Sequence, residues 1–182
     1  MIDTVSRLKR LLKQDPARMR LLKLVAALNL PDAWVAAGFV RNMVWDDLHD
    51  MSSQLLNDVD VIFFAPMDVE NRFAQVATLK LRAWEPNVNW QVKNQVFMHI
   101  RNKDLPYKSC ADAMTYWPEK ETAVAVCVGV DGQLMVNAPF GLGSLFMGHV
   151  SHNPKRDKRV YLQRIADKNW LSIWPKLRLK SE

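Results

Sequence analysis

The chain has 182 residues, of which 49% are hydrophobic and 24% charged, and its formal net charge is +6 at pH 7. This length and apolar share allow a sizeable core to form without covalent staples. No stretch approaches the roughly 20 apolar residues that cross a bilayer, and the first residues lack the apolar core of a signal peptide, so we expect a cytoplasmic protein with no membrane partner.

The charge is unevenly distributed along the chain. Residues 1–30 carry seven Lys or Arg against two Asp, and residues 151–182 carry nine against three acidic residues. The middle has nine basic against fourteen acidic residues. Basic ends around an acidic middle can guide RNA or a nucleotide toward a site in that middle. The alternative is that terminal helices keep solvated Lys and Arg on their outer faces.

Two helices are predicted in the first 30 residues. One follows Asp3 or Thr4, and the second begins with Asp15 as its cap and Pro16 at its first position. Its apolar face includes Leu22 and Val25.

Gly38 marks the next boundary, between a short apolar run at 33–37 and apolar residues at helical spacing over 39–48. The pattern predicts a strand, a turn at Gly38 and a helix. A helix N-terminus offers free amides and a partial positive charge, and a glycine there lets a phosphate approach closely. Arg41, in the first turn, can add a bidentate contact to the same phosphate.

Asp58 and Asp60 stand directly before an apolar run at 61–64. We expect them at positions i and i+2 of one strand, with both side chains on one face. Two adjacent carboxylates repel each other unless a cation compensates, and Mg²⁺ bridging the phosphates of a nucleotide supplies that compensation. A solvated acidic edge is the alternative.

The rest of the chain predicts an α+β fold. We expect a helix over 69–82 with Phe73, Val76, Ala77 and Leu81 inward, and a strand over 88–94 followed by a helix over 96–100. A helix begins at Ser109, strands over 122–130 and 134–136 form a hairpin, and a last helix covers 159–168. The tryptophans at 34, 84, 90, 170 and 174 are expected in the core. Residues 1–182 are expected to form a single domain, in which 1–30 are N-terminal helices and 151–182 a basic C-terminal segment.

Lys93, Asn94 and Gln95 form a polar break between that strand and helix, where they can face a nucleotide or an acceptor. The alternative is an ordinary turn with Asn94 as a helix cap.

Together these motifs resemble the DNA-polymerase-β-like nucleotidyltransferase superfamily, which pairs a small-residue turn opening a helix with a downstream Asp-x-Asp. The segment 38–42 is similar to the Gly-Gly-x-Val-Arg-Asp turn of the tRNA-nucleotidyltransferase branch. A narrower resemblance, to small bacterial nucleotidyltransferase-like proteins, rests on segments at 37–42, 58–64, 92–99, 121–123 and 138–142. It implies a polymerase-β-like fold, a mixed sheet packed by helices.

The resemblance also implies residue roles. Asp58 and Asp60 would bind Mg²⁺ or Mn²⁺ and be catalytic, while Gly38, Arg41, Asn42, Lys93, Asn94 and Gln95 would contact the nucleotide. The reaction implied is attack of an acceptor oxygen on the α-phosphoryl group of a nucleoside triphosphate, with release of pyrophosphate. The acceptor stays open between an RNA end, a protein side chain and a small molecule.

The sequence departs from the superfamily pattern at three places. Ala37 stands where a glycine doublet is usual, and Asn42 where the tRNA enzymes have Asp. A third carboxylate is usual on a later strand, yet no Asp or Glu lies between Pro86 and Lys103. Gln91 in that place can position a hydroxyl but cannot act as a base; Glu119 and Glu121 are the substitutes considered. The alternative function is therefore a catalytically weakened nucleotide- or RNA-binding protein.

Overall fold

The computed structural model describes residues 3–52 and 58–180. In chain order its elements are α1 (Thr4–Lys13), α2 (Pro16–Ala26), β1 (Trp34–Ala36), α3 (Gly38–Leu48), β2 (Val59–Phe63), α4 (Arg72–Trp84), β3 (Trp90–Asn94), the 3₁₀ helix η1 (Gln95–Phe97), α5 (Met98–Asn102), α6 (Cys110–Met114), the 3₁₀ helix η2 (Lys120–Thr122), β4 (Ala125–Val128), β5 (Leu134–Asn137), α7 (Gly143–Phe146), β6 (His149–Ser151), α8 (Lys158–Lys168), α9 (Trp170–Ile173) and β7 (Arg178–Lys180).

The main sheet, within the described residues, has the strand order β3-β2-β1-β4-β5. Strands β2 and β3 are parallel, whereas β1 is antiparallel to both β2 and β4, and β4 is antiparallel to β5. Strands β6 and β7 form a separate parallel pair. The predicted α+β class and mixed sheet are confirmed, and so is the hairpin β4-β5.

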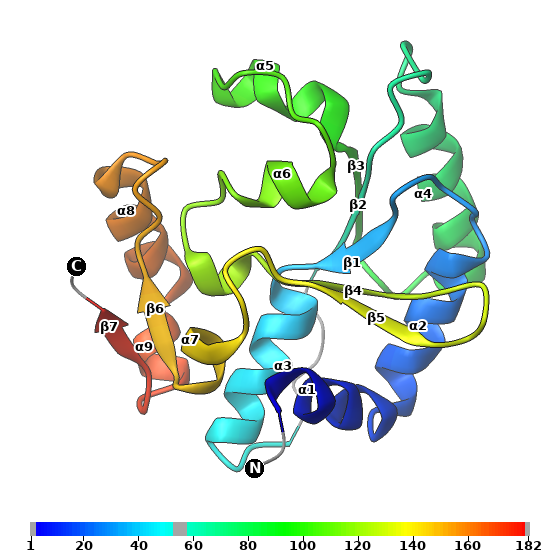
Figure 1. Ribbon diagram of the computed structural model, residues 1–182. Coiled ribbons are helices and arrows are strands. Elements are labelled where there is room, and N and C mark those ends of the chain that lie inside the picture. Colours follow the sequence, from blue (N-terminus) through cyan, green and yellow to red (C-terminus); the bar gives the residue numbers. More distant parts are fainter. Residues whose placement is uncertain (1–2, 53–57, 181–182) are drawn as a thin grey trace.

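Helices cover the sheet on two faces. Figure 1 shows α1, α2 and α3 below the sheet and α6 above it. Strand alternation explains this arrangement, because successive side chains point to opposite faces. Val35 packs in the cluster formed with α1, α2 and α3, while its neighbour Ala36 packs with Cys110 and Met114 of α6.

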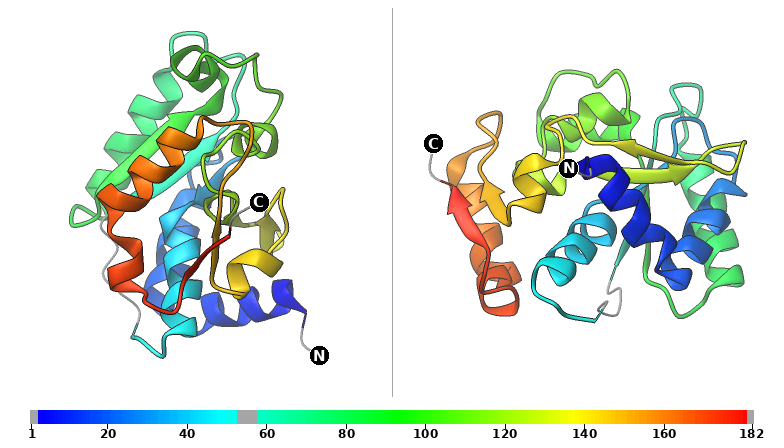
Figure 2. Two further views of the ribbon diagram at one scale, coloured as in Figure 1. Left: turned by 90° about the vertical axis from the view of Figure 1, so that its left-hand side faces the viewer. Right: turned by 60° about the horizontal axis from the view of Figure 1, so that its bottom comes forward.

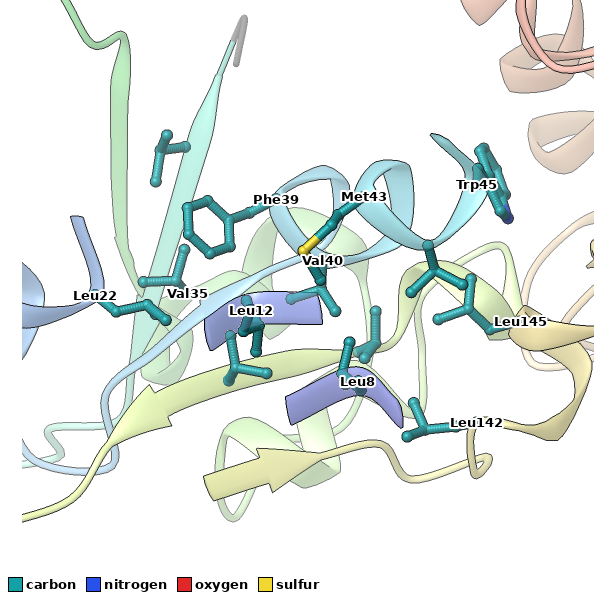
Figure 3. Close-up of a cluster of buried hydrophobic side chains, with 14 of the residues drawn as sticks. Leu8, Leu12, Leu22, Val35, Phe39, Val40, Met43, Trp45, Leu142 and Leu145 are labelled. Atoms are coloured by element: carbon teal, nitrogen blue, oxygen red, sulfur yellow. The ribbon is translucent and has the colours of Figure 1, made fainter. Parts of the chain in front are cut away.

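The larger core cluster joins α1 and α3 to the sheet (Figure 3). Leu8 and Leu12 of α1 and Phe39 and Val40 of α3 are fully buried beside Val35. Each such side chain stabilises the fold by about 1.5–3 kcal/mol through burial. This packing fixes the first turn of α3 against the end of β1.

Local capping explains where several helices begin. The Asp3 carboxylate accepts from the amides of Val5 and Ser6, and the Asp15 carboxylate accepts from the Arg18 amide. A capping side chain of this kind contributes about 1 kcal/mol. Both predicted starts are confirmed, as is the helix start at Ser109, whose hydroxyl accepts from the Asp112 amide.

The C-terminal elements pack on the far end of α3. The ring of Trp45 meets those of Trp170 and Trp174 edge-on, with centroids 5.4 and 5.1 Å away. Trp174 Nε1 also donates to Asp46 Oδ1 at 2.9 Å. Figure 2 shows this group of α8, α9, β6 and β7 beside α3 and α7. Helix α8 is confirmed nearly as predicted.

Three predictions of packing or extent are wrong. Phe73 and Val76 are 44% and 50% exposed, because α4 packs close to the sheet through Ala77, Leu81 and the small Ala74. Trp84 is exposed, unlike Trp90, Trp170 and Trp174. The first hairpin strand begins at 125 rather than 122, because 120–122 form η2.

Within the part of the chain that is described, no helix is long and apolar enough to cross a membrane.

Candidate functional site

The turn between β1 and α3 holds the predicted Gly38 at the first position of the helix. Its conformation places Ala37 at φ 57° and ψ −123°, a region that favours glycine. The Ala37 amide donates to Val124 O at 2.9 Å, and its carbonyl accepts from the amides of Val40 and Arg41. The surrounding bonds thus hold an alanine in a strained conformation.

This strain gives a testable expectation for stability. Ala37→Gly should raise the free energy of unfolding by about 1 kcal/mol, because relief of the positive φ outweighs the added freedom of the unfolded chain. Urea denaturation measures the change. Ala36→Gly, in the adjacent strand position with ordinary backbone angles, is the matched control and should lower stability by about 1 kcal/mol. Equal losses in both variants would show that Ala37 is not strained.

The two predicted carboxylates lie at the start of β2. Asp60 lies on the strand, paired in register with Ala36 of β1 and Gln91 of β3. Asp58 is exposed and stands one residue before the strand rather than on it, a correction to the prediction. Asp58 Oδ1 accepts from Asn89 Nδ2 at 2.6 Å.

Alternate residues of β3 and the residue before it present polar side chains next to this acidic pair. Gln91 Nε2 donates to Asn89 Oδ1 at 3.3 Å, so Asn89 links Gln91 to Asp58. Lys93 Nζ lies 3.3 Å from Asp60 Oδ1. Because these contacts join alternate residues, Asp58 and Asp60 lie on the same side of the sheet.

Gln91, not an acid, therefore stands directly beside Asp60. Among the described residues, no group of three or more His, Cys, Asp or Glu side chains is arranged to hold a metal ion. The candidate cation site therefore consists of the two carboxylates, with the ammonium of Lys93 beside them. Carboxylate oxygens are the donors that Mg²⁺ and Mn²⁺ prefer, so this donor set fits such a cation.

The polar break after β3 divides into two kinds of residue. Asn94 is buried; its Oδ1 accepts from the amides of Ala65 and Val96, and its Nδ2 donates to Ala65 O at 3.1 Å. Gln95 is also buried and donates to Lys93 O at 3.3 Å. Asn94 thus caps the 3₁₀ helix η1, as the alternative interpretation of this segment predicts. Lys93 alone of the three contacts the acidic pair.

Arg41 is a buried cation. Only 6% of it is exposed. Its guanidinium carbon lies 4.6 Å from the Trp45 ring centroid and 4.3 Å from that of Trp170. Nε and Nη2 both donate to Asn42 Oδ1, at 3.2 and 2.9 Å, and Nη1 donates to Thr122 Oγ1 at 2.7 Å.

The electrostatics of Arg41 follow from this burial. Burial lowers the pKa of the guanidinium to about 10, and the charges of Glu119 and Asp60 oppose that shift. The group stays protonated at neutral pH. A Cβ on Gly38 would lie 3.8 Å from Arg41 Nη2 and 3.5 Å from Asn42 Nδ2, so both side chains border the N-terminus of α3. Gly38, Arg41 and Asn42 are brought together as the sequence predicts.

Glu119 and Glu121, the two substitutes for a third carboxylate, are buried and fully engaged. Glu119 accepts from Arg164 Nε at 2.7 Å and from Thr122 Oγ1 at 2.9 Å. Glu121 accepts from the hydroxyls of Ser144 and Ser151 and from the Ser151 amide. Neither is a solvent-exposed base, and both connect η2 to the C-terminal elements.

Sequence reasoning missed Thr122, Arg164 and Trp170 as neighbours of the site. The resemblance includes the segment 121–123 but implies no role for Thr122, and the contact between Arg41 and Thr122 spans 81 positions. Single-sequence periodicity gives no signal for such a contact.

Two hollows of the described surface lie outside the acidic pair and the N-terminus of α3. One of about 450 Å³ lies between the end of α2 and the β4-β5 hairpin, lined by Asp32, Trp34 and Cys127. Another of about 450 Å³ lies along the start of α8, lined by Arg159 and Arg164. Neither hollow is lined by Asp58, Asp60 or Gly38. Asp58 is exposed and Asp60 is half-buried.

Comparisons with known proteins agree on one family. A family profile described as nucleotidyltransferase matches residues 23–179. No curated protein matches the sequence. A solved structure described as revealing a CCA-adding enzyme head domain is 32% identical, with a TM-score of 0.84, over 96% of this chain and 95% of that one. The polymerase-β-like fold is thereby confirmed.

Larger CCA-adding enzymes share the fold at lower identity. A complex with CTP is 13% identical with a TM-score of 0.61, over 97% of this chain and 43% of that one. The Thermotoga maritima CCA-adding enzyme complexed with tRNA is 14% identical with a TM-score of 0.61, over 96% and 42%. This chain thus spans less than half the length of those enzymes.

Proposed function

This chain belongs to the nucleotidyltransferase family, and we propose that it transfers a nucleoside monophosphate from a nucleoside triphosphate to an acceptor hydroxyl, releasing pyrophosphate. One observation carries the proposal above the others. Asp58 and Asp60 lie on the same side of the sheet at the start of β2, and β1, the strand paired with Asp60, leads directly into the N-terminus of α3. A cation site thus adjoins a site for phosphate.

Asp58 and Asp60 would hold Mg²⁺ or Mn²⁺. When bound, the cation would neutralise charge on the triphosphate and stabilise the leaving oxygen. The first amides of α3 have no intrahelical acceptor and would bind phosphate oxygens. Arg41 and Asn42 border that helix end. Lys93, whose ammonium lies beside Asp60, would leave Asp60 and bind a phosphate. Asn94 and Gln95 would shape the loop beneath the nucleotide.

Gln91 would orient the acceptor rather than deprotonate it. Its amide lies beside Asp60 in the sheet and can bond a hydroxyl, but it has no basic group. The proton of the acceptor would then leave to solvent or to Asp60. Catalysis would rest on positioning and electrostatics more than on a dedicated base.

We propose an RNA end as the acceptor. The basic C-terminal segment supports this choice, since Lys158, Arg159 and Lys168 are exposed on α8. Such a surface attracts phosphodiester backbones. The similarity to a CCA-adding enzyme complexed with tRNA points the same way. The alternative function, nucleotide or RNA binding without turnover, is favoured by Gln91 in place of a third carboxylate.

Turnover separates the two functions. The experiment incubates the protein with each of the four ribonucleoside triphosphates, Mg²⁺ and a mixture of short RNAs, and measures nucleotide binding by tryptophan fluorescence and pyrophosphate release in the same samples. The transferase predicts pyrophosphate in step with labelled RNA. Binding with the triphosphate recovered unchanged would support the binding protein, and absence of binding would contradict both.

Lys93 gives a second test of the cation site. Lys93→Met should tighten Mn²⁺ binding in the absence of nucleotide about threefold, because the half-exposed ion pair with Asp60 is worth at most about 1 kcal/mol. The same variant should weaken binding of Mg²⁺–ATP. Electron paramagnetic resonance of free Mn²⁺ measures the first effect. Lys80→Met, at an exposed lysine on α4, is the control and should change neither quantity. Unchanged Mn²⁺ affinity in Lys93→Met would place the cation elsewhere.

A further inference from the structure

A directed chain of hydrogen bonds runs from Arg41 to the C-terminal helices. Arg41 Nη1 donates to Thr122 Oγ1 at 2.7 Å, and Thr122 Oγ1 donates to Glu119 Oε2 at 2.9 Å. A threonine hydroxyl has one proton. Because Thr122 accepts from Arg41 and donates that proton to Glu119, the direction of both hydrogen bonds is fixed. Glu119 is held in turn by Arg164, whose Nε and Nη2 donate to its two oxygens at 2.7 and 3.2 Å.

Aromatic rings restrict the same guanidinium. Trp45 and Trp170 each lie under 5 Å from its central carbon, and both rings are buried. Trp170 also lies 6.0 Å from the guanidinium carbon of Arg164. The rings limit where the Arg41 side chain lies, while the bond to Thr122 fixes its rotation about its long axis. Helices α8 and α9 therefore complete the surroundings of a residue that belongs to α3.

The bonds of Arg41 leave part of its donor capacity unused. Of its five N–H groups, one on Nε, one on Nη1 and one on Nη2 bond Asn42 or Thr122. The second N–H of each terminal nitrogen has no acceptor among the described residues. Nη2 also borders the N-terminus of α3 beside Gly38. A buried cation with unused donors at this place suits an anion, because desolvated charge-assisted bonds are strong.

We infer that Thr122 and Glu119 are positioning residues for nucleotide binding. They orient Arg41 so that its unused N–H groups face the triphosphate. Neither residue touches the nucleotide; each acts through Arg41. The inference rests on the proposed function, and it gives a role to Thr122, which lies in one of the segments that carry the sequence resemblance.

A purely structural role predicts something different. If Thr122 and Glu119 only anchor α8 and α9, their loss lowers stability but affects all nucleotides alike. The orienting role predicts a loss that depends on the number of phosphates. The informative quantity is therefore the ratio of the affinities for ATP and AMP, measured with Mg²⁺ on folded protein.

The experiment compares Thr122→Val with Thr122→Ser. Valine keeps the shape of threonine but removes the hydroxyl, whereas serine keeps the hydroxyl and loses the methyl group. We expect Thr122→Val to lower the ATP-to-AMP affinity ratio about tenfold, in line with loss of a bond that orients a charged donor. Thr122→Ser should stay within about twofold of wild type. Isothermal titration calorimetry gives both affinities, and thermal unfolding confirms that each variant is folded.

Glu119→Gln serves as the second variant if Thr122→Val does not fold. It keeps the volume and an acceptor oxygen but removes the charge that holds Thr122 and Arg164, so the ratio should fall about threefold. An ATP-to-AMP affinity ratio equal to that of wild type in Thr122→Val would overturn the inference and leave the proposed function standing. The same result in Glu119→Gln would do so if Thr122→Val does not fold. Equal falls in the Val and Ser variants would also overturn it. Wild-type protein that does not prefer ATP to AMP would overturn the proposed function and this inference together.

Discussion

Asp60→Asn is expected to lower the rate of pyrophosphate release at least about 1,000-fold while the chain stays folded. The amide keeps the size of the carboxylate but binds a divalent cation weakly, and loss of that charge stabilisation removes several kcal/mol from the transition state. The fold should tolerate the change, because Asp60 is only half-buried and its ion pair with Lys93 is worth at most about 1 kcal/mol. Steady-state release of pyrophosphate is the measurement.

Asp131→Asn is the matched control for this prediction. Asp131 is exposed in the turn between β4 and β5, and its charge has no part in the proposed chemistry. The control should keep wild-type turnover within about twofold, since an exposed carboxylate outside the site contributes little. Turnover in Asp60→Asn above a tenth of the wild-type rate would remove Asp60 from the catalytic role.

Arg41→Met is expected to lower both the free energy of unfolding and the affinity for ATP. The methionine fills the space between Trp45 and Trp170 but gives up three hydrogen-bond donors and two cation–π contacts. We expect the free energy of unfolding to fall by about 2–4 kcal/mol, because Thr122 and Asn42 lose their buried partner. Affinity for ATP should fall about a hundredfold and that for AMP less than about threefold.

Arg20→Met provides the control for the stability loss. Arg20 pairs with Glu85, but its side chain is 61% exposed, so this change should cost less than about 1 kcal/mol. Urea denaturation of both variants gives the comparison, and titration calorimetry at a temperature where Arg41→Met is folded gives the affinities. A loss that is equal for ATP and AMP would show that Arg41 does not serve the outer phosphates.

Local signals in the sequence predicted much of the fold. Caps at Asp3, Asp15 and Ser109 act within three residues, so each helix start could be predicted from its own neighbourhood. Gly38 likewise marked the passage from β1 to α3. The alternation around Asp60 identified the strand, although β2 begins one residue after Asp58.

Packing of α4 shows why other features escaped prediction. Periodicity placed the large Phe73 and Val76 inward, but the helix approaches the sheet through Ala74 and Ala77. Small residues permit that close approach, and the larger ones beside them are left half-exposed. A hydrophobic pattern favours burial of the large apolar residues and does not reveal that the small alanines contact the sheet.

The surroundings of Arg41 depend on distant residues. The place of Arg41 in the first turn of a helix suggested a contact to phosphate, but it gave no sign of burial, because an arginine is seldom fully buried. Its partners Thr122 and Trp170 come from η2 and α9, far along the chain. No local pattern connects these positions, and only the folded sheet with its C-terminal helices brings them together.

The proposed function requires Asp58 and Asp60 to hold a divalent cation together with a nucleoside triphosphate. The most direct measurement is Mn²⁺ binding by electron paramagnetic resonance, with and without a non-hydrolysable ATP analogue, in wild type and in the Asp58→Asn, Asp60→Asn double variant. We predict that the analogue increases the amount of Mn²⁺ bound to wild type and that the double variant loses this bound fraction. Equal Mn²⁺ binding by the two proteins in the presence of the analogue would show that these two carboxylates do not hold the cation.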